Sequence, residues 1–181
     1  MPRTTKTFDL KEEEQRIDRE MNEAADEAAE AEDGSRTHEE AMARGKLLER
    51  ELAGVQWALY PDEEEDRDPY EEVTLGALNA REYGEIGDRV KTAKEQSAGT
   101  ASGLTSMEGV QQIFFVAGGL VDAPFIPENA SFEEKSQAVG DLSPQFVTYL
   151  QQQVDDLSTP NVQGNGFAQR VAERQSAATS E

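Results

Sequence analysis

The only histidine of the chain, His38, is the first side chain to consider for acid–base or metal chemistry. It lies among Thr37, Glu39 and Glu40, where a helix is expected to begin. At such a position a side chain in solvent is the common state, and a catalytic base or metal ligand is the rarer one. The chain has no cysteine, so thiolate ligands and disulfides are excluded. We therefore expect no metal site at His38.

Other short patterns that could do chemistry are incomplete. The acidic run PDEEEDRDPYEE carries many carboxylates but lacks the D-x-D-x-D-G spacing and closing Glu of a calcium loop, so it favours a solvated linker. Gly164 and Gly166 form only a G-x-G fragment, without the strand and helix of a nucleotide site. Phosphate-loop and G-x-S-x-G patterns are absent. The sequence predicts no cofactor and no enzyme, although a buried pair of catalytic carboxylates stays open.

Apolar side chains that could contact another protein are the remaining candidates. Large hydrophobic residues recur at helical spacing in the second half of the chain, where they could cover an exposed apolar stripe of a partner. The alternative for each of them is a place in the domain's own core. The predicted contact surface consists of Ile113, Phe114, Phe115 and Phe125, with Phe146 and Leu150 as supporting core.

Composition limits the partners. A net charge of −21 and a pI near 4.3 repel phosphates, so the sequence predicts no nucleic-acid binding. No apolar run approaches a membrane span and the N-terminus lacks the apolar centre of a signal peptide, so we expect a soluble, intracellular protein without membrane partners. Either disorder or adaptation to high salt explains such a charge, and we favour the second because apolar residues recur at helical spacing.

Local patterns predict the elements that position these side chains. Val73, Leu75 and Ala77 alternate as in a strand, and Asn79 with Glu82 forms a capping box for the next helix. Further helix starts are indicated by the pairs Thr105–Glu108, Ser131–Glu134 and Ser143–Pro144. The segment 118–119, Gly-Gly, is expected to close the helix that contains Phe114 with a left-handed residue.

The fold class predicted is mainly α, a small helical core with one short β-strand or hairpin. Two acidic helices, at about 9–33 and 37–60, are expected to precede it, with Trp57 packed beside the second helix or, alternatively, used for interaction. The predicted organisation is an acidic helical extension (1–60), a charged linker (61–71), the helical core domain (72–159) and a flexible tail (160–181).

Two segments resemble a known family. The run VTLGALNAREYGEIGDRV resembles the strand-to-helix opening of tail assembly chaperones of tailed viruses, where a "V-x-L-x-x-L-x-A-R-E" phrase precedes a helix. The run from Ile113 to Ser158 is similar to that family's second half, with a "V-V-D-P" type turn and a "L-P-x-x-x-V-x-x-L" helix. Here the turn, Val121 to Pro124, is one residue longer, and Ser143-Pro144 replaces Leu-Pro. The resemblance covers roughly half of the chain.

The resemblance implies a non-enzymatic factor of the host cytoplasm. Such a factor binds the tape measure protein, helps to recruit tail-tube protein around it, and is absent from the mature virion. The acidic composition would then suggest a virus of a salt-loving archaeon, and homo-oligomers are possible. Two alternatives stay open: a structural virion protein of the head–tail or capsid accessory kind, and an acidic helical adaptor or regulatory protein.

Overall fold

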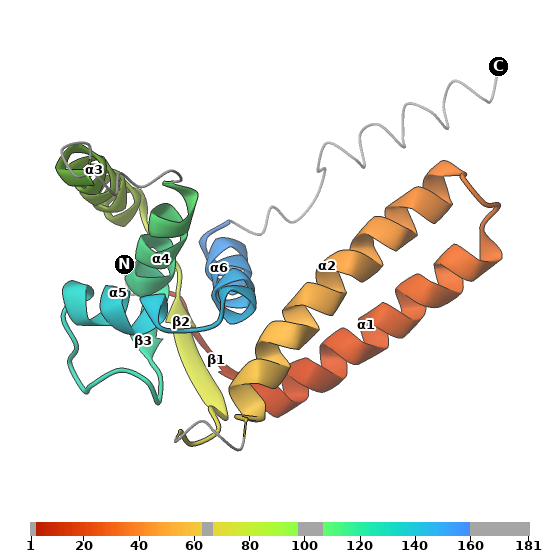
Figure 1. The fold of residues 1–181 in the computed structure, drawn as a ribbon, viewed down its shortest axis with the longest axis horizontal. Coiled ribbons are helices and arrows are strands. Elements are labelled where there is room, and N and C mark those ends of the chain that lie inside the picture. The colour runs from red at the N-terminus through yellow and green to blue at the C-terminus, as the bar shows by residue number, and fades with distance from the viewer. Residues whose placement is uncertain (1–2, 63–66, 98–106, 160–181) are drawn as a thin grey trace.

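The fold of the chain is mainly helical with a small antiparallel sheet, which confirms the predicted class (Figure 1). It was obtained as a computed structural model that describes residues 3–62, 67–97 and 107–159. In chain order the elements are β1 (Thr5–Asp9), α1 (Leu10–Glu30), α2 (Arg36–Leu59), β2 (Glu72–Gly76), α3 (Ala80–Ser97), α4 (Glu108–Gly119), β3 (Leu120–Asp122), α5 (Phe132–Gly140) and α6 (Pro144–Ser158).

The sheet has the strand order β1-β2-β3, with both neighbouring pairs antiparallel. Only β2 was expected from the sequence. In β1, Phe8 pairs with Val73, and both side chains are buried together with Leu75. Arg3 reinforces this pairing, because its guanidinium donates to the carbonyl oxygens of Ala77, Gly76 and Gly118. The N-terminal strand is therefore an edge of the central sheet.

Helix starts follow the capping signals. The Asn79 side chain accepts a hydrogen bond from the Glu82 backbone N–H at 3.1 Å, and the Glu82 carboxylate accepts one from the Asn79 N–H at 2.8 Å. Ser131 and Glu134 form the same reciprocal pair, and Ser143 caps α6. These three predictions are confirmed. Thr105, of the fourth predicted pair, lies outside the described residues.

Helices α1 and α2 form a long antiparallel pair, the hairpin arm, which extends away from the rest of the fold (Figure 1). The turn between them contains Gly34 with φ of 73°, a conformation that glycine adopts easily. His38 is half-buried here, and its Nδ1 donates to the Ala28 carbonyl oxygen at 3.0 Å. His38 thus ties the start of α2 to the end of α1.

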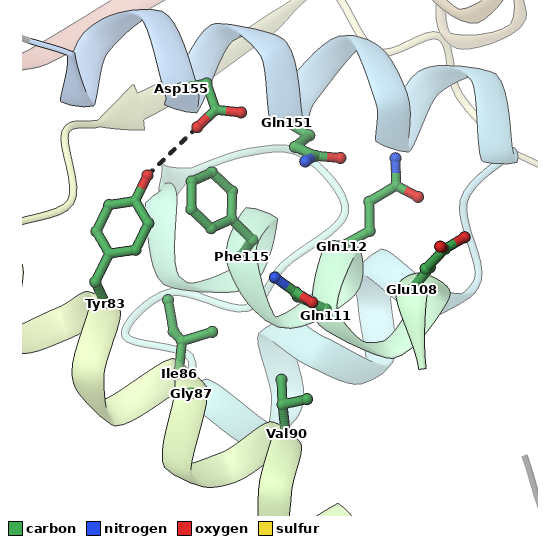
Figure 2. A pocket seen from close by; sticks show the side chains of 10 residues that line it. All are labelled: Tyr83, Ile86, Gly87, Val90, Glu108, Gln111, Gln112, Phe115, Gln151 and Asp155. Carbon is green, nitrogen blue, oxygen red and sulfur yellow. Dashed lines mark hydrogen bonds between the residues drawn. The ribbon is translucent and has the colours of Figure 1, made fainter. Parts of the chain in front are cut away.

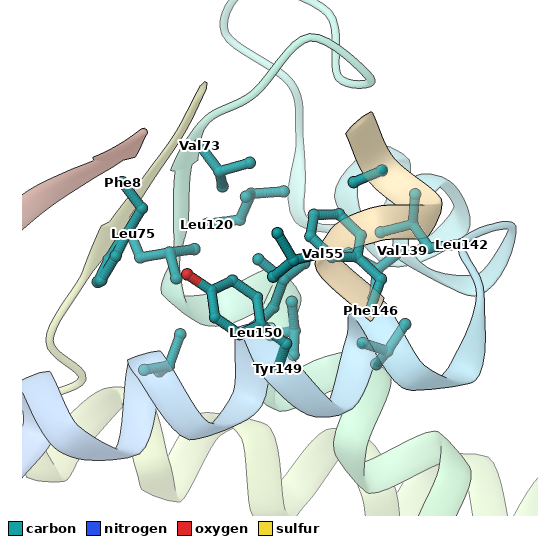
Figure 3. Packing of buried hydrophobic residues seen from close by; sticks show 14 of the residues in the cluster. Phe8, Val55, Val73, Leu75, Leu120, Val139, Leu142, Phe146, Tyr149 and Leu150 are labelled. Carbon is teal, nitrogen blue, oxygen red and sulfur yellow. The ribbon is translucent and has the colours of Figure 1, made fainter. Parts of the chain in front are cut away.

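One hydrophobic cluster joins the hairpin arm to the later elements (Figure 3). Leu10, Ile17 and Val55 from the arm are fully buried in the same cluster as Phe146 and Leu150 from α6. The boundary predicted at residue 60 therefore divides the sequence but does not separate two cores. The predicted tail, 160–181, and residues 63–66 of the linker lie outside the described ranges.

The prediction for 118–119 was wrong. Neither glycine has a positive φ, and α4 runs through both before β3 begins at Leu120. Gly119 serves a different purpose, because a Cβ there would collide with the Val154 side chain of α6. The glycine allows these two helices to approach closely.

The hydroxyl of Tyr149 is buried where α6 packs against the hairpin arm. The side chain is fully buried, and the hydroxyl has no hydrogen-bond partner among the residues that the structure describes. Burial raises the pKa of this phenol far above its ordinary value, and the negative charge of Glu13 raises it further. A neutral, unpaired hydroxyl at this position lowers stability.

Tyr149→Phe is expected to raise the free energy of unfolding by about 1 kcal/mol, because it removes a desolvated donor and keeps the ring. Urea denaturation of both proteins followed by circular dichroism measures the difference. A loss of about 1 kcal/mol instead would show that the hydroxyl donates to Glu13.

Candidate functional site

The first wall of the candidate site is one face of α3. The capping box at Asn79 fixes where this helix begins, and the spacing of Tyr83, Ile86, Gly87 and Val90 places all four on one side. Ile86 is buried against α4, whereas Tyr83 remains 43% exposed. This face is therefore buried at Ile86 and open to solvent at Tyr83.

Helices α4 and α6 supply the other two walls. Phe115 of α4 is buried, whereas Gln112 is half-buried and Gln111 is exposed. In α6, Gln151 and Asp155 are one turn apart and face the same space, since Phe146, Leu150 and Val154 occupy the opposite, buried side. Figure 2 shows the ten side chains that surround this space.

The result is an open groove of about 570 Å³, here called the three-helix groove. Its floor is apolar, formed by Ile86, Val90 and Phe115, and its rim carries amides and carboxylates. A pocket with an apolar floor and few polar groups is the usual form of a binding site. The groove is suited to hold an apolar side of a partner while polar groups fix its orientation.

Tyr83 and Asp155 close one end of the groove (Figure 2). The Tyr83 hydroxyl donates to Asp155 Oδ1 at 3.3 Å, and its ring meets that of Phe115 edge-on with centroids 5.2 Å apart. Burial raises the pKa of the Tyr83 phenol, and the charge of Asp155 and this hydrogen bond raise it further. Tyr83 thus stays a hydrogen-bond donor at neutral pH.

The four side chains predicted as a contact surface and the two predicted as its supporting core do not form one surface. Phe115 contributes to the floor of the three-helix groove, whereas Phe146 and Leu150 are fully buried. Phe114 lines a separate hollow between α3 and α5, where its ring meets Phe132 at 5.6 Å.

The remaining two candidates lie elsewhere. Phe125 is half-buried and packs on Tyr70 with ring centroids 5.2 Å apart, beside another hollow. Ile113 is half-buried and faces Gly140 at the end of α5. Phe114 and Phe115 are neighbours in the sequence, but helix α4 directs them into two separate hollows.

Several groove residues were not among the predicted contacts. The spacing of Tyr83, Ile86 and Val90 indicates one helix face, which is equally typical of a face packed in the core. Gln151 and Asp155 gave no signal, because single polar residues on a helix are common in solvent. The one indication of a groove was that the helix face beginning at Tyr83 is longer than packing in the core requires.

Among residues 3–62, 67–97 and 107–159, no three His, Asp or Glu side chains come together as a possible metal site. No helix within these ranges has both the length and the apolar character needed to cross a bilayer.

The fold and groove define a mainly helical protein with a concave, partly apolar surface. No protein-family model matches the chain, and neither a curated protein nor a solved structure shows significant similarity to it.

Proposed function

We propose that this chain is a non-enzymatic assembly chaperone that binds an apolar helical segment of a client protein in the three-helix groove. The observation that carries the proposal is the open groove of about 570 Å³, in which an apolar floor of Ile86, Val90 and Phe115 is surrounded by a polar rim. Amphipathic helices bind in such grooves through apolar residues spaced three and four apart. The charge of −21 would keep a complex with a poorly soluble client in solution.

The specific form of the proposal is a tail assembly chaperone of a tailed virus. Its client would be the tape measure protein, with tail-tube protein recruited later, in the host cytoplasm and before the virion is complete. Support comes from the position of the two resembling segments: 73–90 supplies the α3 wall, and 113–158 supplies Phe115 of the α4 wall and the whole α6 wall. The apolar stripes of a long helical client must stay covered until the tail tube encloses the client.

The groove offers a direct test at Gly87. A Cβ at this position meets no heavy atom within 4 Å, so a large side chain would enter the groove without disturbing the core. We expect Gly87→Trp to abolish copurification with the tape measure protein encoded in the same genome, and to leave that protein insoluble on coexpression in molar salt.

Gly84→Trp is the matched control. Gly84 lies in the same helix with equally open space around it, but it does not line the groove. This variant should bind the client as the unaltered chain does. Copurification that survives Gly87→Trp, or a genome without a tape measure gene, would contradict the proposal.

A structural virion protein is a second candidate, favoured by the hairpin arm. The arm extends from the fold and exposes Met42 by 45% and Leu47 by 60%, as an oligomerisation element would (Figure 1). Mass spectrometry of purified particles separates the two candidates. Stoichiometric presence in mature virions would favour this second function over a departing chaperone.

A further inference from the structure

The charged residues that line the three-helix groove in the described part of the chain are all acidic. Of the ten described residues that line it, Asp155 and Glu108 are carboxylates and none is Lys or Arg. The walls α4 and α6 contain no basic residue anywhere along their length. On α3, Lys94 lies one turn beyond Val90 and is not a lining residue, and Arg89 faces the other side, where it pairs with Glu133 at 2.7 Å.

The two carboxylates lie at different ends of the apolar floor (Figure 2). Asp155 is at the Tyr83 end, and Glu108 is at the Val90 end beside Gln111 and Gln112. At the Asp155 end, the edge-on rings of Tyr83 and Phe115 adjoin the carboxylate. An aromatic pair next to a carboxylate attracts ammonium and guanidinium groups through both charge and ring quadrupole.

We propose that the three-helix groove selects a cationic amphipathic helix, whose apolar side covers Ile86, Val90 and Phe115 while a Lys or Arg reaches the Tyr83–Asp155 end. This inference rests on the proposed function and specifies its partner. Charge complementarity decides the occupant, because an acidic or neutral helix would bury Asp155 without a counter-charge. A second copy of this chain is disfavoured for the same reason, since each copy carries a charge of −21.

Three designed peptides test the selection. Each is about 18 residues long, five helical turns, with the same leucine stripe and with Lys, Gln or Glu at all outward positions. Fluorescence anisotropy in dilute salt should show the Lys peptide binding at least about tenfold more tightly than the Gln peptide. The Glu peptide should show no binding.

Site-directed variants distinguish selection by the groove from attraction to the whole acidic surface. Asp155→Asn should weaken binding of the Lys peptide roughly fivefold, about what one partly exposed charge contributes. Glu128→Gln removes the same charge at an exposed position outside the groove and should change affinity by less than about twofold. Equal effects of the two substitutions would overturn the inference.

Gly87→Trp separates failure of this inference from failure of the proposed function. If this variant blocks the Lys peptide while Asp155→Asn has no effect, the groove binds helices without selecting cations, and only the inference fails. If Gly87→Trp leaves binding unchanged, the groove is not the site and both fail. If the unaltered chain instead dimerises in sedimentation runs and Gly87→Trp makes it monomeric, a second copy occupies the groove, which also overturns the inference.

Discussion

Replacing Phe146 with alanine is expected to lower the free energy of unfolding by about 3 to 5 kcal/mol. The ring is fully buried and lies at the centre of an aromatic cluster, with Trp57, Tyr149 and Phe125 at centroid distances of 5.9, 6.1 and 6.4 Å. These neighbours come from α2, α6 and the segment after β3, so they cannot all move inward to fill the space. Denaturant titration followed by tryptophan fluorescence measures the loss, since Trp57 is the only tryptophan.

Phe114→Ala is the control for this substitution. Phe114 is half-buried, and among the described residues its ring meets only that of Phe132, so we expect a loss of about 1 to 2 kcal/mol. The comparison also decides whether Phe146 is a contact residue or a core residue, which the sequence alone leaves open. A Phe146→Ala protein with unchanged stability and lost client binding would place it in a contact surface.

Signals within a few residues of each other predicted the helix starts well. Asn79 with Glu82 and Ser131 with Glu134 satisfy each other's backbone groups three residues apart, so no distant part of the chain affects them. The apolar stripes of α1 and α6 were visible for the same reason, because helical periodicity is a local property.

The sheet was only partly predictable. In TKTFD, the sequence of β1, Phe8 is the only apolar residue, and the strand forms because it pairs with Val73, 65 positions later. Strand β3 has three residues and depends on β2 in the same way. Since such pairings are decided by the tertiary fold, propensity alone does not identify them.

The groove, too, could not be predicted without knowledge of the tertiary structure. Tyr83 and Asp155 are 72 residues apart, and only the packing of α3 and α6 on α4 brings them together. The sequence shows that Tyr83, Ile86 and Val90 share a face, but it does not show where along that face burial ends. A partly buried helix face and a binding groove have the same periodicity, so the two interpretations differ only in three dimensions.

The hairpin arm and α6 cross at Gly54, and Gly54→Ala is expected to lower the free energy of unfolding by about 3 kcal/mol. A Cβ there would lie 2.6 Å from the carbonyl carbon and oxygen of Gln145 and 2.8 Å from the Phe146 nitrogen. These are backbone atoms in the first turn of α6, which Ser143 and Pro144 hold in place, so the helices themselves must separate. Thermal and urea denaturation measure the effect.

Gly45→Ala, in the same helix, is the matched control because a Cβ at Gly45 meets nothing within 4 Å. Alanine should raise stability there by about 0.5 to 1 kcal/mol, through helix propensity alone. If Gly54→Ala lowers the free energy of unfolding and Gly45→Ala raises it, α2 is part of the cooperative core, because only the tight crossing on α6 distinguishes Gly54 from Gly45. If both alanines stabilise the protein equally, the crossing contributes nothing to stability, and the predicted acidic helical extension, 1–60, is not part of the cooperative core.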